Sequence, residues 1–219
     1  MQGRKSFLFD LNGTMIDDME FHLKVWHETL NSELGANLSW QEVRSHMYGK
    51  NQEVLIRIFG PQRFTSEEAD AISYQKEVKY QALYKPHLSL LPGLFDFMKL
   101  AQLNKINMAI GSAASLFNID FVLDNLNIRQ YFDCIVSADD VVNSKPHPET
   151  YLKGARLLGV EPSSCIVFED APKGVESARN AGMPCVVITS MHQEVEFNEY
   201  DNILMFVKDY TDPRLLKLL

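Results

Sequence analysis

The sequence predicts an α/β protein with a three-layer core, in which a parallel sheet lies between layers of helices, and with a second, helical domain inserted into that core. Three observations carry this prediction. A short apolar run near the N-terminus ends in a carboxylate, four segments of helical periodicity follow without a convincing strand, and strands alternate with helices from Pro92 onward. The chain of 219 residues, 46% hydrophobic and 23% charged, is long enough for one core domain carrying a smaller insert.

The first expected strand covers about residues 5–10 and ends in the stretch Asp10-Leu11-Asn12-Gly13-Thr14. An aspartate at the end of a buried strand, followed by backbone amides and a hydroxyl, is well placed to act as a nucleophile. An acidic N-cap at an ordinary strand-to-helix turn would have the same sequence. This stretch alone leaves both interpretations open.

Four helices are expected next, at about residues 19–34, 39–47, 51–59 and 65–84. Gly35 is the expected terminator of the first helix, and Asn51 is the expected N-cap of the third. Thr65 and Glu68 have the spacing of a capping box at the start of the fourth. Together these helices predict a compact cap domain over residues 16–90.

The remaining residues, 1–15 and 91–219, are expected to form a Rossmann-like core because strands and crossover helices alternate there. Pro92 is expected in the first turn of a helix that ends at Leu103. Further strands are expected at residues 108–111, 134–137, 165–168, 185–188 and 203–207, with helices at 116–126, 148–158 and 175–181 and a short one capped by Thr211-Asp212-Pro213.

Reactive side chains follow several of these strands, at the sheet edge where α/β proteins bind their ligands. They are Ser112, Lys145, Glu169 and Asp170, in addition to Asp10. The three carboxylates would repel one another unless a hard divalent cation lay among them, and oxygen ligands favour Mg²⁺ over zinc. A hydroxyl, an ammonium and Mg²⁺ around a nucleophilic carboxylate meet the requirements of phosphoryl transfer, which spreads negative charge over the phosphoryl oxygens.

Four ordered motifs resemble those of the haloacid dehalogenase superfamily over essentially the whole chain: D-L-N-G-T, the turn at Ser112, S-K-P-H-P and F-E-D-A-P-K-G-V-E-S-A-R-N-A-G-M. The helical insert resembles the four-helix cap of the β-phosphoglucomutase-like branch, which contains phosphatases and hexose-phosphate mutases. Each motif alone is a weak signal. The four in order, at fitting strand ends, are specific.

The resemblance implies a role for each matching residue. Asp10 would be the nucleophile that forms an aspartyl-phosphate, and Ser112 and Lys145 would stabilise the phosphate and the nucleophile. The Mg²⁺ ligands would be Asp10, Asp170 and the backbone carbonyl of Asn12, with help from Glu169. The substrate phosphate would also meet the turn residues Gly13, Thr14 and Ala113.

Asn12 departs from the family pattern, which has a second aspartate there as general acid and base. An amide cannot transfer the proton, and losing such a transfer lowers a rate by about 10²- to 10⁴-fold. Three explanations are open: an engineered substitution that traps a bound state, a natural protein with weakened turnover, or a natural protein that uses Asp18 or His22 as its acid. We favour the first because the other motifs are intact.

The expected cap residues of the substrate site are Glu20, His22, Gly49, Lys50, Gln52 and Lys76. Mutases of the family tend to have a lysine before the loop glycine and an arginine three residues after it, whereas this chain has Tyr48 and Gln52. We therefore expect a monophosphate phosphatase, with a sugar phosphate as its substrate class. A phosphohexomutase is the alternative, and a catalytically silent phosphate- and Mg²⁺-binding protein is the alternative outside enzymology.

The formal net charge of −8 argues against a nucleic-acid or anionic-membrane surface. No apolar stretch has the length of a membrane span or signal segment, and the three cysteines have no short C-x-x-C spacing. We expect a cytoplasmic monomer whose partner is a small phosphorylated metabolite.

Overall fold

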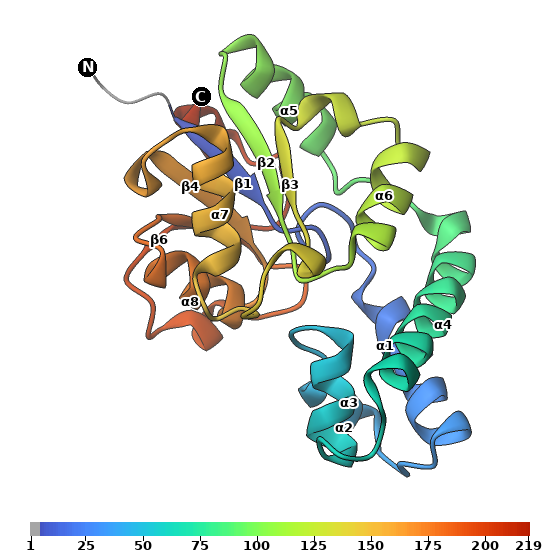
Figure 1. The fold of residues 1–219 in the computed structure, drawn as a ribbon. Helices are drawn as coiled ribbons and strands as arrows, with labels where there is room; N and C mark the ends of the chain where they lie inside the picture. Colours follow the sequence, from blue (N-terminus) through green and yellow to red (C-terminus); the bar gives the residue numbers. More distant parts are fainter. Residues whose placement is uncertain (1–4) are drawn as a thin grey trace. The chain divides into compact units, whose positions relative to one another are not determined.

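The computed structural model describes residues 5–219 and divides the chain into two compact units (Figure 1). The core unit consists of the chain up to Asp17 together with Ser89–Leu219, and the helical unit consists of Asp18–Leu88. Among the described residues, no helix combines the length and the apolar character needed to cross a bilayer.

Within residues 5–219, the core unit contains one six-stranded parallel sheet in the order β3-β2-β1-β4-β5-β6. Its strands are β1 (Ser6–Phe9), β2 (Asn107–Gly111), β3 (Cys134–Val136), β4 (Cys165–Glu169), β5 (Cys185–Ile188) and β6 (Ile203–Val207). The strands β1, β4 and β5 are continuously buried, which is typical of parallel sheets covered on both faces. The expected α/β sheet is confirmed.

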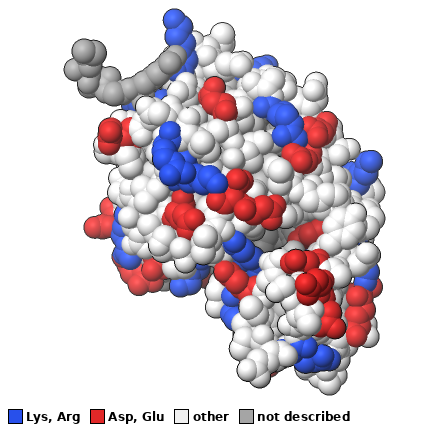
Figure 2. Space-filling model, in the orientation of Figure 1, with Lys and Arg blue, Asp and Glu red and all other residues white. Residues whose placement is uncertain are grey.

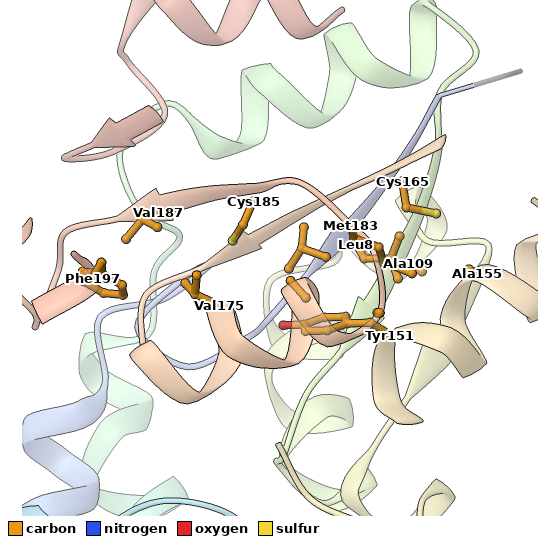
Figure 3. Close-up of a cluster of buried hydrophobic side chains, with 13 residues drawn as sticks. Leu8, Ala109, Tyr151, Ala155, Cys165, Val175, Met183, Cys185, Val187 and Phe197 are labelled. Atoms are coloured by element: carbon orange, nitrogen blue, oxygen red, sulfur yellow. The ribbon is translucent and has the colours of Figure 1, made fainter. Parts of the chain in front are cut away.

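Helices cover both faces of this sheet, so the unit has three layers. They are α5 (Leu94–Leu103), α6 (Leu116–Asn125), α7 (Glu149–Leu158) and α8 (Pro172–Asn180). On one face, Leu8 and its neighbours in the sheet pack with Tyr151 of α7 and Val175 of α8 (Figure 3). On the other face, Phe7 stacks on Phe97 of α5 with ring centroids 5.6 Å apart. Adjacent residues of β1 thus point into different cores, as strand geometry requires.

The centre of the sheet is where its strand order reverses. Residue Phe9 of β1 pairs with Ile110 of β2 on one side and with Phe168 of β4 on the other. The carboxyl ends of β1 and β4 therefore adjoin, and in open α/β sheets this switch point is where ligands bind.

The helical unit is built from α1 (Met19–Glu28), α2 (Trp40–His46), α3 (Asn51–Phe59) and α4 (Ser66–Tyr84). Helix α1 continues into a π-helical turn at Thr29–Glu33, so the helical segment ends close to its expected limit. Trp26, Leu30 and Val43 belong to its apolar core. The capping box of Thr65 and Glu68 is present as expected.

Two expected helix-terminal assignments are wrong, although the third helix starts at residue 51 as expected. Asn51 is the first residue of α3 rather than its N-cap, because the extended backbone that precedes a helix belongs to Lys50. Pro92 precedes α5 instead of lying in its first turn, because Gly93 takes the N-cap position with a left-handed backbone. A side chain at Gly93 would lie 2.6 Å from the backbone of Tyr210, so the turn before α5 requires glycine.

The other differences are small. Helix α8 starts at Pro172, three residues before the expected start at Val175, because proline suits the first helical turn. The three cysteines begin β3, β4 and β5 and are free thiols, of which Cys134 is only half-buried.

Candidate active site

Asp10 is the first residue after β1, and its backbone continues the pairing of β1 with β4. Its N–H donates to the carbonyl of Phe168 over 3.0 Å. This bond places Asp10 beside Glu169 and Asp170 at the end of β4, and all three side chains are buried. Residues from distant parts of the sequence are thus brought together by the register of two strands.

The turn after Asp10 packs directly against Asp170. Gly13 has φ of 72°, and a Cβ atom built there would lie 2.1 Å from Asp170 Oδ2. The hydroxyl of Thr14 donates to Asp170 Oδ1 over 3.1 Å. The glycine gives Asp170 room and the threonine orients it, so both residues of the motif act on a carboxylate of another strand.

Lys145 bridges two of the carboxylates. Its Nζ atom donates to Asp10 Oδ1 and to Glu169 Oε1, each over 2.7 Å, and the ammonium is buried. Burial disfavours this charge, but the two carboxylates outweigh that effect and raise the pKa of Lys145 above its ordinary value. The lysine is therefore a fixed positive charge at neutral pH.

Glu169 is held on both oxygens. Oε1 accepts from the Tyr151 hydroxyl over 2.7 Å as well as from Lys145, and Oε2 accepts from the backbone N–H groups of Asp170 and Ala171 over 3.0 and 3.2 Å. These bonds use all of the roughly four lone-pair sites of a carboxylate. Gly174 leaves space for this carboxylate, since a Cβ there would lie 1.8 Å from Oε1.

Ser112 reaches the same place from β2. Its N–H donates to the carbonyl of Val136 over 3.0 Å, and its side chain hydrogen-bonds the carboxylate of Asp10. The Ser112 hydroxyl oxygen also accepts from the N–H of Ala114 over 3.2 Å. The next residue in the turn, Ala113, is half-buried.

The electrostatics of the carboxylates show a site with surplus negative charge. Burial raises the pKa of Asp10 to about 6, repulsion by Glu169 adds to this, and Lys145 works against it. Burial, together with the charges of Glu169 and Asp10, also raises the pKa of Asp170 well above its usual range. Three carboxylates face one ammonium, so a divalent cation would complete the charge balance.

The donor set fits Mg²⁺. Asp10, Glu169 and Asp170 each offer an oxygen, and these oxygens all lie within 4.8 Å of one another. Carboxylate oxygens are hard ligands, and a small number of them is what Mg²⁺ uses in proteins. Because Glu169 is already saturated with hydrogen bonds, Asp10 and Asp170 are the better direct ligands.

Asn12 lies between Leu11 and Gly13 in this turn and is half-buried. Its backbone forms a bridge with Ile16, so the turn folds back on itself. The carbonyl of Asn12 is a neutral oxygen ligand, whereas its side-chain amide supplies no ionisable proton.

Two residues that sequence reasoning missed support the site. Tyr151 holds Glu169, and the ammonium of Lys145 lies 4.6 Å from the centre of its ring. The hydroxyl of Ser190 donates to the carbonyl of Gly13 over 2.6 Å. Ser190 follows β5 closely, so the rule that locates ligands at strand ends could have found it. In sequence, Tyr151 is indistinguishable from an ordinary core residue of a helix.

In the helical unit, His22 and Lys76 form a buried pair. Lys76 Nζ lies 2.7 Å from His22 Nδ1 and 3.0 Å from Glu77 Oε1. His22 Nε2 lies 3.3 Å from Asp18 Oδ2, which also accepts from the Tyr80 hydroxyl. Burial lowers the pKa of Lys76, and Glu77 offsets part of this effect. Both ring nitrogens of His22 therefore have polar partners within the helical unit.

The remaining cap residues make other contacts. Glu20 is exposed and forms an ion pair with Arg44, and the Gln52 amide donates to Asp70 over 2.8 Å. Gly49 has φ of 75°, and the N–H of Lys50 donates to Glu53 over 3.0 Å.

A further cap cation, Arg57, braces the segment before Gly49. Its Nη2 donates to the carbonyls of His46, over 2.8 Å, and of Tyr48. Its guanidinium also lies 3.7 Å from the centre of the Tyr48 ring. Sequence reasoning missed this residue.

The Rossmann-like sheet holds a lysine-bridged cluster of carboxylates at its switch point, and a helical unit is inserted after β1. These two features together are typical of haloacid dehalogenase-like proteins. The family model described as haloacid dehalogenase-like hydrolase matches residues 7–188. The chain belongs to this family.

The relatives include sugar-phosphate enzymes. The fructose-1-phosphate phosphatase YqaB of Escherichia coli is 30% identical over 190 residues, covering 82% of this chain and 93% of that protein. The structure of β-phosphoglucomutase from Clostridium difficile is 26% identical with a TM-score of 0.85, covering 98% of this chain and 95% of that chain. A mutant of CbbY from Rhodobacter sphaeroides with an aspartate changed to asparagine, in complex with xylulose-1,5-bisphosphate, is 26% identical with a TM-score of 0.82, covering 95% and 96%. The resemblance to the β-phosphoglucomutase-like branch is confirmed.

Proposed function

We propose that this protein is built as a Mg²⁺-dependent phosphatase for a small phosphorylated metabolite, with a sugar phosphate as substrate class and an aspartyl-phosphate as intermediate. One observation carries the proposal: Lys145 holds Asp10 and Glu169 together by two 2.7 Å bonds at the switch point of the sheet. The names of the relatives, a sugar phosphatase and a sugar-phosphate mutase, support the substrate class.

The chemistry has two displacements at phosphorus. A carboxylate oxygen of Asp10 attacks the phosphorus, the bond from phosphorus to the ester oxygen breaks, and the leaving alkoxide takes up a proton. Water then attacks the phosphorus of the acyl phosphate, loses a proton, and releases inorganic phosphate and the Asp10 carboxylate. Lys145 and Ser112 hold the attacking carboxylate in place, which is the positioning that phosphoryl transfer depends on.

The metal would be held by Asp10, Asp170 and the carbonyl of Asn12, with Glu169 holding the loop that carries Asp170. Bound Mg²⁺ would neutralise charge on the phosphoryl oxygens. Asp170 is prepared for this role by Thr14, which fixes the orientation of its carboxyl group.

Because residue 12 is an asparagine, no general acid or base stands at the position where the family pattern has one, and both proton transfers need another group. His22 is a poor replacement because both of its ring nitrogens are engaged, by Lys76 and by Asp18. Asp18 is a poor one because it holds His22 and Tyr80. We therefore propose that this chain binds substrate and turns it over slowly. An engineered substitution remains our favoured explanation.

The cap favours a monophosphate over a bisphosphate. Three of its cations, Arg44, Arg57 and Lys76, are engaged by partners within the helical unit. A mutase that grips a second phosphate requires cations that are free to do so. The surface drawn in Figure 2 carries acidic and basic side chains interspersed, and the net charge is −8, so a small metabolite suits the protein better than nucleic acid.

The test is hydrolysis of p-nitrophenyl phosphate and of a panel of sugar phosphates by this chain and by Asn12→Asp, with Mg²⁺ and with a chelator. We expect Asn12→Asp to be faster by about 10²- to 10⁴-fold and to lose its activity in chelator. Asp10→Ala in the Asn12→Asp background is the matched control, and it should be inactive.

Two outcomes favour the alternatives. Conversion of β-glucose 1-phosphate to glucose 6-phosphate by Asn12→Asp indicates a phosphohexomutase. Thermal stabilisation by phosphate and Mg²⁺ without turnover of any ester by either form indicates a silent binding protein, for which Asn12 is the supporting observation.

A further inference from the structure

Lys145 lies in a loop, residues 142–147, whose backbone is held by a side chain outside the candidate site. Glu149, the first residue of α7, accepts three hydrogen bonds of 2.9 Å from this loop. Its Oε1 accepts from the N–H of Val142, and its Oε2 accepts from the N–H and the side-chain amide of Asn143. One carboxylate thus fixes two consecutive peptide units just before Lys145.

The other end of the loop is held by α8. The Ser177 hydroxyl donates to the carbonyl of His147 over 2.8 Å, and the Asn180 amide donates to the carbonyl of Pro146 over 3.0 Å. Lys145 therefore lies between two anchored segments, one held by α7 and one by α8. Helix α8 directly follows the Glu169-Asp170 loop, so the same helix connects the lysine loop to the carboxylates.

Such anchoring matters because of the length of the lysine side chain. Lys145 has four rotatable bonds, so holding its ammonium between Asp10 and Glu169 costs side-chain conformational entropy, before any backbone freedom is counted. A fixed backbone removes that second contribution. The hydrogen bonds from Val142 and Asn143 lower the pKa of Glu149 to about 2, so the anchor is a carboxylate over the whole working pH range.

We propose that Glu149 is a positioning residue for Lys145: it acts through the loop backbone to keep the ammonium between Asp10 and Glu169. The importance of this positioning for catalysis rests on the proposed function. The position of the Lys145 ammonium itself can be tested without any ligand. The residue touches neither the carboxylate cluster nor the ammonium, so its effect is transmitted through residues 142–144.

The first experiment measures the acetylation rate of individual lysines by acetic anhydride, read by peptide mass spectrometry, in the chain as it is. A buried ammonium that donates to two carboxylates reacts slowly because the reagent must reach it and displace both hydrogen bonds. In Glu149→Ala we expect Lys145 to react several-fold faster and the amides of residues 142 and 143 to exchange hydrogen faster. The matched control is Glu176→Ala, which removes a partly exposed glutamate paired with Lys173 on α8. It should leave Lys145 unchanged.

Asn143→Ala separates local from global effects, because it keeps Glu149 and removes one of the three bonds. If all lysines react faster in Glu149→Ala, faster labelling confined to Lys145 in Asn143→Ala still supports the proposal. Unchanged labelling of Lys145 in Glu149→Ala, or in Asn143→Ala after such a global effect, overturns it.

The second experiment measures binding of orthovanadate, a phosphate analogue, with Mg²⁺ by calorimetry. We expect at least tenfold weaker binding in Glu149→Ala, partial recovery in Glu149→Gln, which keeps one acceptor oxygen, and no change in Glu176→Ala. Equal affinity in Glu149→Ala and the parent overturns the positioning role. If the parent itself binds no vanadate, the proposed function fails, and the labelling result still decides whether Glu149 holds Lys145.

Discussion

The hydroxyl of Tyr151 donates a 2.7 Å hydrogen bond to Glu169 Oε1, the oxygen that also accepts from Lys145. The ring of Tyr151 belongs to the apolar cluster between the sheet and helices α7 and α8, among Leu8, Ala109 and Val175 (Figure 3). Burial and the neighbouring carboxylate of Glu169 raise the pKa of this phenol well above its usual range, so it remains a donor. A core residue therefore determines where a carboxylate of the candidate site lies.

Replacing this hydroxyl tests the connection. In Tyr151→Phe, Glu169 loses one donor while the core keeps its ring, so we expect the free energy of unfolding to fall by about 1–3 kcal/mol. Urea denaturation measures this change. Tyr131→Phe is the control, since this half-buried tyrosine packs edge-on against Phe95 and has no bond to the carboxylate cluster. Equal effects of the two variants would show that the bond to Glu169 contributes nothing specific.

A side chain at Gly13, in the turn after β1, would collide with Asp170, and this predicts an effect on Mg²⁺ binding. Gly13→Ala places a methyl group 2.1 Å from Asp170 Oδ2, and we expect it to abolish Mg²⁺ binding in calorimetry. Gly159→Ala is a matched control, because Gly159 has a similar φ of 68° but no neighbouring atom within 4 Å. It should cost only the left-handed backbone strain of about 1–2 kcal/mol and leave Mg²⁺ binding intact. Normal Mg²⁺ affinity in Gly13→Ala would contradict the role given to Asp170.

Removal of Lys145 should be costly in the metal-free protein. Lys145→Ala leaves two buried carboxylates without their cation, and breaking a buried ion pair in this way costs about 3–5 kcal/mol. The control is Lys153→Ala, which breaks a surface pair with Asp140 worth about 0–1 kcal/mol. Chemical denaturation of both variants, with and without Mg²⁺, measures the difference, and we expect Mg²⁺ to restore part of it. A loss below 1 kcal/mol in Lys145→Ala would argue against the bridge.

The raised pKa of Asp10 predicts a pH dependence of stability. In the folded, metal-free protein this pKa is about 6, against an ordinary value of 3.8, so folding favours the protonated form. The resulting stabilisation is fully present below about pH 3.8 and is lost as the pH rises through about 6. Asp170, whose pKa is also raised, adds a contribution of the same sign.

The comparison that isolates this effect is with Asp10→Asn, whose amide does not titrate. Between pH 4 and 7 without metal, the parent should lose more unfolding free energy than this variant. Carboxylates with a lowered pKa, such as Glu149, contribute with the opposite sign and are common to both proteins. Parallel stability curves for the parent and Asp10→Asn would contradict the raised pKa.

The sequence was sufficient to predict the sheet and most of its helices, because each signal there is local. Asp10, Ser112 and Glu169 all follow apolar runs, and the carboxyl ends of parallel strands meet at one edge. Helix N-caps were harder to place. Asn51 and Pro92 have residue types suited to a helix start, but the backbone places the caps at Lys50 and Gly93.

Two of the residues that support the site could not be predicted from the same signals. Tyr151 and Glu149 lie in α7 at positions where an aromatic and an acidic residue are ordinary, and their roles depend on contacts with distant strands and loops. In the cap, the residue types of Lys76 and Gln52 suggested substrate contacts. The structure gives their partners within the helical unit, which are Glu77 and His22 for the lysine and Asp70 for the glutamine, and the substrate contacts stay a prediction.

The segment that leaves the core unit and the segment that returns to it are hydrogen-bonded to each other. Ile16 and Leu90 form an antiparallel bridge, and the N–H of Leu91 donates to the carbonyl of Met15 over 2.8 Å. The insertion therefore begins and ends at adjacent points, and the sheet needs no change of register to accommodate whatever lies between them. Residues 18–88 are in this sense an exchangeable module: a cap of another size, grafted between Asp17 and Ser89, would leave the nucleophile, the lysine and the carboxylates where they are.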